Sequence, residues 1–190
     1  MQLTSVPYLK YRAQRGVVLP LALFLLVVMT IIGIMVISNS TQSDKSIQSL
    51  RSNAIAQQGA EIGLRYCENV VMTNVDDASK ASSQEKSDFT KVYATSIATQ
   101  DDTNAIWRTK ANWSAGAANR IDIPSAAYQK STSGDIKIAP ACIIQKLGSN
   151  SYLITARGFG NDAQVTDTTK KDTVKTGAEV WLQSVITPES

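Results

Sequence analysis

An uncharged apolar run at residues 17–37 constrains what this chain can fold into more than any other feature. The run has 21 residues, and a helix needs about 20 such residues to span the hydrocarbon of a bilayer. Lys10, Arg12 and Arg15 precede the run, and the next basic residue is Lys45. The positive-inside rule therefore predicts a cytoplasmic N-terminus and a periplasmic or extracellular remainder. A cleaved secretory signal is the alternative, but its apolar region is usually only about 7–15 residues long.

Charge and composition argue against several classes of function. The 190 residues include 19 Lys and Arg against 16 Asp and Glu, and three of the basic residues lie before residue 17, so the remainder balances at 16 against 16. This remainder has no cluster of basic residues, which argues against nucleic-acid binding because contacts to phosphate need grouped Lys and Arg. Histidine is absent, which excludes Ser-His-Asp and Cys-His catalysis and zinc sites with His ligands. We expect no enzymatic activity and no cofactor.

The apolar run is predicted to continue outward as one long helix. Nothing breaks a helix between residue 38 and about Met72, where Gln, Ala, Arg, Leu and Glu dominate. Gly59 and Gly63 have the spacing of a membrane dimerisation motif, but they lie outside the apolar run, so close packing on a head domain is the better interpretation. Larger apolar residues recur at helical spacings in this outer half: Ile47, Leu50, Ala54, Ile55, Ile62, Tyr66 and Val70.

The chain has two cysteines, Cys67 and Cys142. In an oxidising compartment the simplest use of an even pair is one disulfide. Closing a loop of about 75 residues would contribute about 4 kcal/mol in the chain-entropy model. The alternative is two unrelated buried thiols.

The sequence pattern of residues 73–127 predicts a linker, a short helix and then irregular structure. Residues 73–84 are polar and have the composition of a linker. Ser82 and Glu85 have the spacing of a capping box, and the apolar residues that follow predict an amphipathic helix over residues 84–98 that covers one face of a sheet. Residues 99–127 show no regular period, and we expect mostly loop there.

The last third of the chain changes to a period of two, which predicts strands over residues 142–147, 152–157 and 178–185. Gly-Ser-Asn-Ser at residues 148–151 suits a hairpin turn, so the first two strands should be antiparallel. The Thr-rich residues 161–177 have no core-forming pattern and should form a solvated surface loop. The predicted fold class is α+β, with a small antiparallel sheet.

Two motifs resemble those of enzymes but lack the required context. Residues 158–163 match the G-x-G-x-x-A turn of dinucleotide-binding proteins, but no helix pattern follows, so glycines at a strand end or bulge explain the match. Ser83-x-x-Lys86 and the Lys-Thr-Gly of residues 175–177 occur in the order seen in serine β-lactamases. The Ser-x-Asn element is missing and the chain is too short for those folds, so a chance match is the better interpretation.

Two groups of oxygen-bearing side chains could supply ligands to calcium. The first is Asp101, Asp102 and Asn104, and the second is Asp162 and Asp167. Neither group follows the spacing of an EF-hand loop, so solvated carboxylates are the favoured interpretation.

The boundary at Gly16 resembles the start of type IV prepilins. Arg-Gly-Val-Val-Leu-Pro-Leu-Ala-Leu at residues 15–23 places a short basic leader that ends in Gly directly before an apolar helix. With the long helix, the cysteine pair and the strand patterns of residues 152–158 and 180–184, the whole chain resembles a PilX-type minor pilin of the type IV pilus.

The resemblance implies the type IV pilin fold, in which a long N-terminal helix packs on a small antiparallel sheet. It implies a leader at residues 1–16, a transmembrane or filament-core helix half at residues 17–40, and a periplasmic head at residues 41–190. Prepilin peptidase would cleave between Gly16 and Val17, and the new amine of Val17 would be methylated. Most pilins carry Glu at the fifth mature position, where this chain has Leu21.

The resemblance also implies a function in assembly, without catalysis. The protein would help to initiate type IV pili within a minor-pilin tip or priming complex, with other minor pilins, the major pilin and a tip adhesin as partners. It would reside in the inner membrane before assembly and in the pilus afterwards. The alternatives are a tip pseudopilin of a type II secretion system, which also lacks the acidic residue, and a single-pass membrane-anchored sensor or enzyme.

Overall fold

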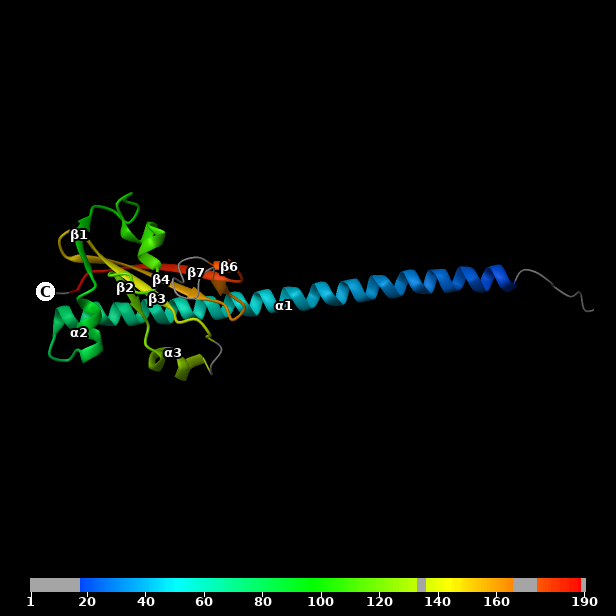
Figure 1. Ribbon diagram of the computed structural model, residues 1–190, viewed down its shortest axis with the longest axis horizontal. Helices are drawn as coiled ribbons and strands as arrows, with labels where there is room; N and C mark the ends of the chain where they lie inside the picture. The colour runs from blue at the N-terminus through cyan, green and yellow to red at the C-terminus, as the bar shows by residue number, and fades with distance from the viewer. Residues whose placement is uncertain (1–17, 133–135, 166–173, 189–190) are drawn as a thin grey trace, which may run out of the picture. The chain divides into compact units, whose positions relative to one another are not determined.

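The computed structural model describes residues 18–132, 136–165 and 174–188 (Figure 1). Gly16 and Val17, the residues predicted to flank the cleavage site, lie outside the described residues. The chain divides into two units, Met1–Ser46 and Ile47–Ser190, each of which is described by itself.

Helix α1 runs without interruption from Val18 to Asp76. This confirms the predicted long helix, which ends at Asp76 rather than near Met72. Within α1 no proline follows Pro20, which explains why the helix is continuous. Pro20 itself is tolerated because it lies in the first turn, where the backbone N–H groups have no helical partner. In the first unit, the stretch Val18–Met35 is long and apolar enough to cross a membrane, and none of it is buried.

The second unit is α+β and contains a five-stranded mixed sheet. The strands β3, β4 and β7 match the three predicted strands, and both of their pairings are antiparallel. The turn between β3 and β4 begins at Gly148, whose φ of 63° lies in the left-handed region that glycine adopts readily. The sheet has the order β1-β3-β4-β7, with β2 also paired to β3, and its strands are β1 Tyr93–Ile97, β2 Arg120–Asp122, β3 Ala141–Leu147, β4 Ser151–Phe159 and β7 Glu179–Ile186.

The prediction of a helix over residues 84–98 was wrong in its second half. The capping box of Ser82 and Glu85 is present and begins helix α2, but α2 covers only Ser83–Phe89. Residues 93–97 form β1, which lies parallel to β3, so the sheet is mixed rather than antiparallel throughout. The spacing of four between Tyr93 and Ile97 places both side chains on one face of a strand as well as of a helix, and pairing with the open edge of β3 decided the outcome.

The two predicted loops contain short regular elements. Within residues 99–127 the structure has the 3₁₀ helices η1 Ile106–Arg108 and η2 Lys110–Trp113, the strand β2 and the start of helix α3 Ser125–Thr132. Within residues 161–177, β5 Gln164–Val165 pairs with β6 Val174–Thr176 as a separate two-stranded sheet. These elements are two to eight residues long, which is too short to leave a periodic signal in the sequence.

Both faces of the main sheet are covered. On one face, α1 packs through Cys67, Val70 and Val71 against side chains of β3 and β4 that include Ile144 and Ile154. The segment that contains η1 and η2, green in Figure 1, covers the other face. It does so with Ile106, Trp113 and Ala105, which pack against Ile143 and Leu153. Two covered faces explain why β3 is apolar at consecutive positions.

The predicted apolar stripe is correct from Ile55 onward, because Ile55 and Val70 are buried and Ile62 and Tyr66 pack against the core, but it does not include the residues before Ser52. Ile47 is 61% exposed and Leu50 is 67% exposed, because packing on the sheet begins only at Ser52. The residues of α1 that are buried from there to the disulfide are Ser52, Ile55, Ala56, Gly59, Ala60, Gly63 and Cys67. They let the helix backbone approach the strands closely.

Glycines complete this close approach from both sides, as the packing interpretation of Gly59 and Gly63 predicted. A Cβ on Gly59 or Gly63 would meet Pro140 at 3.5 Å, an ordinary contact. On the strand side, a Cβ on Gly158 would collide with the helix backbone at Ala56 and Ala60. Gly158 therefore belongs to the interface between α1 and β4.

Candidate functional site

The apolar part of α1 is the first candidate for a functional surface. None of its large side chains is buried over Val18–Met35, and nearly all of them are exposed, Leu21 by 57%. Such a surface is unfavourable in water, because burial of apolar area contributes about 25 cal/mol per Å². A lipid bilayer or other apolar helices must therefore cover it. Leu21 is one of these exposed apolar side chains and carries no charge.

A cysteine pair connects α1 to the sheet. Cys67 of α1 and Cys142 of β3 form a disulfide, with their Cα atoms 6.7 Å apart, and both are completely buried. The pair fits the bridge expected from the sequence. It lies within the core cluster between helix and sheet, so it joins the two elements where they already pack together.

A buried carboxylate fixes α2 to α1. Asp88 is fully buried and accepts hydrogen bonds from the hydroxyl of Tyr66 at 2.9 Å and from Gln84 at 3.0 Å. The ammonium group of Lys91 pairs with its other oxygen at 2.9 Å. Desolvation, and then the hydrogen bond to Asp88, raise the pKa of the Tyr66 hydroxyl above its ordinary value. A charged group that is buried in this way needs all of these partners, because an unpaired buried carboxylate is costly.

A cavity of about 620 Å³ opens on the face of the sheet that α1 does not cover. All three tryptophans of the chain line it, although they come from η1, η2 and β7. Trp113 and Trp181 meet edge to face with their ring centres 4.6 Å apart. The Trp113 Nε1–H donates a hydrogen bond of 2.7 Å to the carbonyl oxygen of Trp107, which joins the two 3₁₀ helices. The sequence contains no local sign that these three residues converge.

Charged side chains share the wall of this cavity. Arg157 is buried on β4 and pairs with Glu179 of β7, and its guanidinium group stacks over the rings of Phe159 and Trp181. The remaining lining residues are Arg108, Lys110 and Val174. The cavity therefore combines aromatic surface with three cationic groups and one carboxylate.

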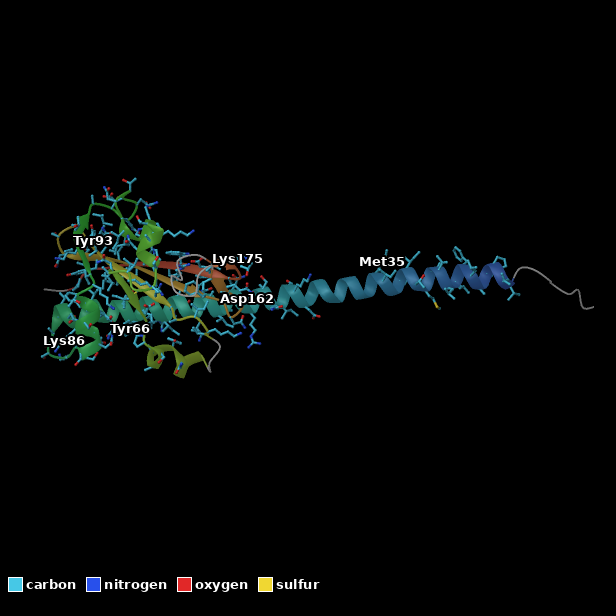
Figure 2. The ribbon with its side chains drawn as sticks, viewed as in Figure 1. Met35, Tyr66, Lys86, Tyr93, Asp162 and Lys175 are labelled. Carbon is cyan, nitrogen blue, oxygen red and sulfur yellow. A yellow bond between two sulfur atoms is a disulfide. The ribbon has the colours of Figure 1, made fainter. Side chains whose placement is uncertain are left out.

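The enzyme-like motifs do not form sites. Lys86 and Lys175, the lysines of the β-lactamase-like pair, lie at opposite ends of the second unit (Figure 2). In the G-x-G-x-x-A motif, Gly158 packs against α1, and a Cβ on Gly160 would collide with Ser52. These contacts explain both glycines without a bound dinucleotide.

The two calcium candidates do not gather ligands among the residues that the structure describes. Asp102 accepts hydrogen bonds from Asn104, and Asp101 lies 3.5 Å from the guanidinium of Arg108. Asp162 accepts a hydrogen bond from Ser52, whereas Asp167 lies outside the described residues. Within the described part of the chain, no three His, Cys, Asp or Glu side chains are grouped so that they could hold a metal ion.

Comparison with known protein families, with curated proteins and with solved structures finds no match to this chain. The fold itself is an N-terminal apolar helix followed by an α+β head with a mixed sheet. This layout is compatible with a pilin-like fold, and the one candidate membrane span among the described residues fits a single-pass anchor.

Proposed function

We propose that this protein is a PilX-like minor pilin that helps to initiate type IV pili within a tip or priming complex. The observation that carries the proposal is the continuity of α1 from an exposed apolar stretch, Val18–Met35, to residues that are buried against the sheet of the head. The same helix is thereby apolar enough for a bilayer in one part and adapted to a folded domain in another. The short basic segment that ends at Gly16 supports the same function.

The chemistry of the helix explains how such a subunit acts. The apolar stretch is shielded by lipid while the protein waits in the inner membrane with a periplasmic head. On assembly, the apolar stretches of neighbouring subunits cover one another, so the hydrophobic surface does not return to water. The head then presents its loops at the filament surface. Partners of this subunit are other minor pilins, the major pilin and a tip adhesin, and prepilin peptidase removes the leader.

Processing of the N-terminus tests the proposal. The mature protein should begin at Val17 and carry a methylated amine, because the apolar helix directly follows Gly16. Intact-mass analysis of protein extracted from membranes measures this. Replacing Gly16 by Val should block cleavage and leave the leader attached, whereas Gly33→Ala in the same helix should be processed normally, since a Cβ there meets nothing within 4 Å.

Two results would contradict the proposal. A mature chain that begins at Met1 would indicate a membrane-anchored sensor or enzyme instead. A correctly processed chain that co-purifies with the pseudopilins of a type II secretion system, and not with pilins, would assign it to that system. Mass spectrometry of proteins that co-purify with the native chain distinguishes the two filament systems.

A further inference from the structure

The tryptophan-lined cavity has the properties of a binding site. Its volume of about 620 Å³ lies within the range of about 300–1,000 Å³ that is usual for small-molecule sites. Trp181 is 41% exposed and offers aromatic surface, whereas Trp113 is 1% exposed and supports it from behind. Trp113 in turn is held by its hydrogen bond to Trp107, so the aromatic wall is ordered before any ligand arrives.

The charged side chains of the cavity differ in whether they have an ion-pair partner of opposite charge. Arg157 is buried and paired with Glu179, so this pair contributes planar polar groups to the wall with little net charge. Arg108 stacks on Trp107 at 4.6 Å and lies 3.5 Å from an exposed carboxylate, that of Asp101.

Lys110, like Arg108, is exposed, but it differs from Arg108 in its partners. Among the described residues, none forms an ion pair or hydrogen bond with its ammonium group. Within the described residues, the cavity therefore offers an anion a cation that has no countercharge beside it.

We infer that this cavity binds an acidic sugar unit, a six-membered ring that bears a carboxylate. The C–H face of such a ring packs on the open surface of Trp181, because the indole combines a large apolar area with a polarised ring. The sugar hydroxyls find an acceptor in the partly exposed carboxylate of Glu179, which the buried guanidinium of Arg157 holds in place. The sugar carboxylate pairs with Lys110, with Arg108 close by as a second cation.

The alternative anions fit this cavity less well. A nucleobase also stacks on tryptophan, but single-stranded nucleic acid needs a groove with cations spaced along the backbone. Arg108 and Lys110 are two residues apart and supply charge at one place only. A neutral apolar ligand would leave Lys110 without a partner and would desolvate the polar groups of the wall. The inference does not rest on the proposed pilus function.

Intrinsic fluorescence offers a direct test, because every tryptophan in the chain lines this cavity. The full chain in detergent micelles is titrated with trigalacturonate, with a neutral galactose trimer and with a thymidine trinucleotide. The expected result is a saturable change in emission with trigalacturonate that weakens as ionic strength rises. The neutral trimer and the trinucleotide should bind at least tenfold more weakly.

Matched variants assign the binding to this cavity. Lys110→Gln should weaken the binding of trigalacturonate roughly two- to fivefold, the effect of losing one exposed ion pair. Lys86→Gln removes the same charge from α2, outside the cavity, and should leave the affinity unchanged (Figure 2). Trp181→Phe should also weaken binding, with the melting temperature recorded to show that the head remains folded.

Four results would overturn the inference. The first is no saturable change with trigalacturonate up to millimolar concentrations. The second is equal affinity for the neutral trimer, which would remove the role of charge. The third is tighter binding of the trinucleotide, and the fourth is an equal loss of affinity in Lys86→Gln and Lys110→Gln.

Discussion

At the scale of single residues, Tyr66 and Asp88 illustrate how one polar contact secures two helices. The Tyr66 side chain, labelled in Figure 2, reaches from α1 to the buried carboxylate of Asp88 near the end of α2. Because burial and this hydrogen bond raise the pKa of Tyr66, the folded state holds the phenol proton more tightly than the unfolded state does. The stability that this provides is fully present below the ordinary tyrosine pKa of about 10 and is lost as pH rises through the higher folded value.

Replacing Tyr66 by Phe should therefore change both the stability and its dependence on pH. At neutral pH the variant should lose about 1 kcal/mol, because Asp88 keeps Gln84 and Lys91 as partners. Above about pH 10 the wild-type protein should lose stability more steeply than the variant. Thermal unfolding of the detergent-solubilised chain across this range measures the effect.

Tyr152→Phe is the control for this measurement, because the Tyr152 hydroxyl has no hydrogen-bond partner among the described residues. It should keep the wild-type slope with pH. A Tyr66→Phe protein that loses stability above pH 10 as steeply as the wild type would show that this phenol is not the group responsible.

At the scale of elements, the packing of α1 on β4 depends on backbone proximity more than on large side chains. A Cβ at Gly158 would lie 2.9 Å from the carbonyl carbon of Gly59 and closer still to two further backbone atoms of the helix. A Cβ at Gly59 would meet nothing closer than 3.5 Å. The two glycines face each other across one interface but differ in what they tolerate.

We therefore predict opposite effects for two identical substitutions. Gly158→Ala should destabilise the head by about 3 kcal/mol or more, since helix and strand must separate to admit the methyl group. Gly59→Ala should be neutral or stabilise the protein by up to about 1 kcal/mol, because alanine has the better helix propensity. Chemical denaturation of the two variants beside the wild type measures both effects. Equal losses in the two variants would contradict the close approach at Gly158.

The disulfide acts between the same elements. Replacing Cys67 or Cys142 by Ser should lower the stability of the head by about 2–5 kcal/mol, because the unfolded chain regains the freedom of a loop with a sequence separation of 75. The double variant should lose no more than the single variants, since either change removes the same bridge. Peptide mapping without reduction tests the connection itself, and two free thiols in protein isolated from native membranes would refute it.

At the scale of the whole molecule, Leu21 bears on where the proposed pilin sits in a filament. In type IV pilins, the acidic fifth residue of an incoming subunit is thought to pair with the N-terminal amine of the subunit ahead of it. A buried charge needs such a partner in an apolar helix bundle. Leu21 cannot make this contact, but the amine of Val17 can still receive it from the next subunit. The proposed function therefore predicts a position at the first-assembled, distal end.

Immunogold microscopy of tagged protein tests this position. The wild-type protein should label filament tips, and Leu21→Glu should also label the shaft, because it restores the carboxylate. Leu23→Glu introduces the same charge at an equally exposed position of α1 and should not move the label to the shaft. If the wild-type protein labels the shaft as often as Leu21→Glu does, Leu21 is only an apolar residue suited to the bilayer and says nothing about order.

Several elements could be predicted from sequence patterns that involve only neighbouring residues. The length of α1, the capping box at Ser82 and the strands β3, β4 and β7 follow from period, composition and turn residues. The pairing of two cysteines follows from their number and the expected compartment. The exposed apolar stretch Val18–Met35 is the clearest case, because hydrophobicity and length suffice to define it.

Contacts between residues far apart in the chain were decided only by the tertiary structure. Residues 93–97 became a strand because β3 had an open edge for them, although their spacing also fits a helix. Between Ser52 and Gly63 the buried side of α1 consists mainly of small residues, which carry little hydrophobic signal, because the strand at Gly158 approaches the helix backbone so closely. Trp107 and Trp181 share a cavity because the segment that contains η1 covers the face of the sheet to which Trp181 of β7 belongs. The two residues are far apart in the sequence, so no local pattern predicts this contact.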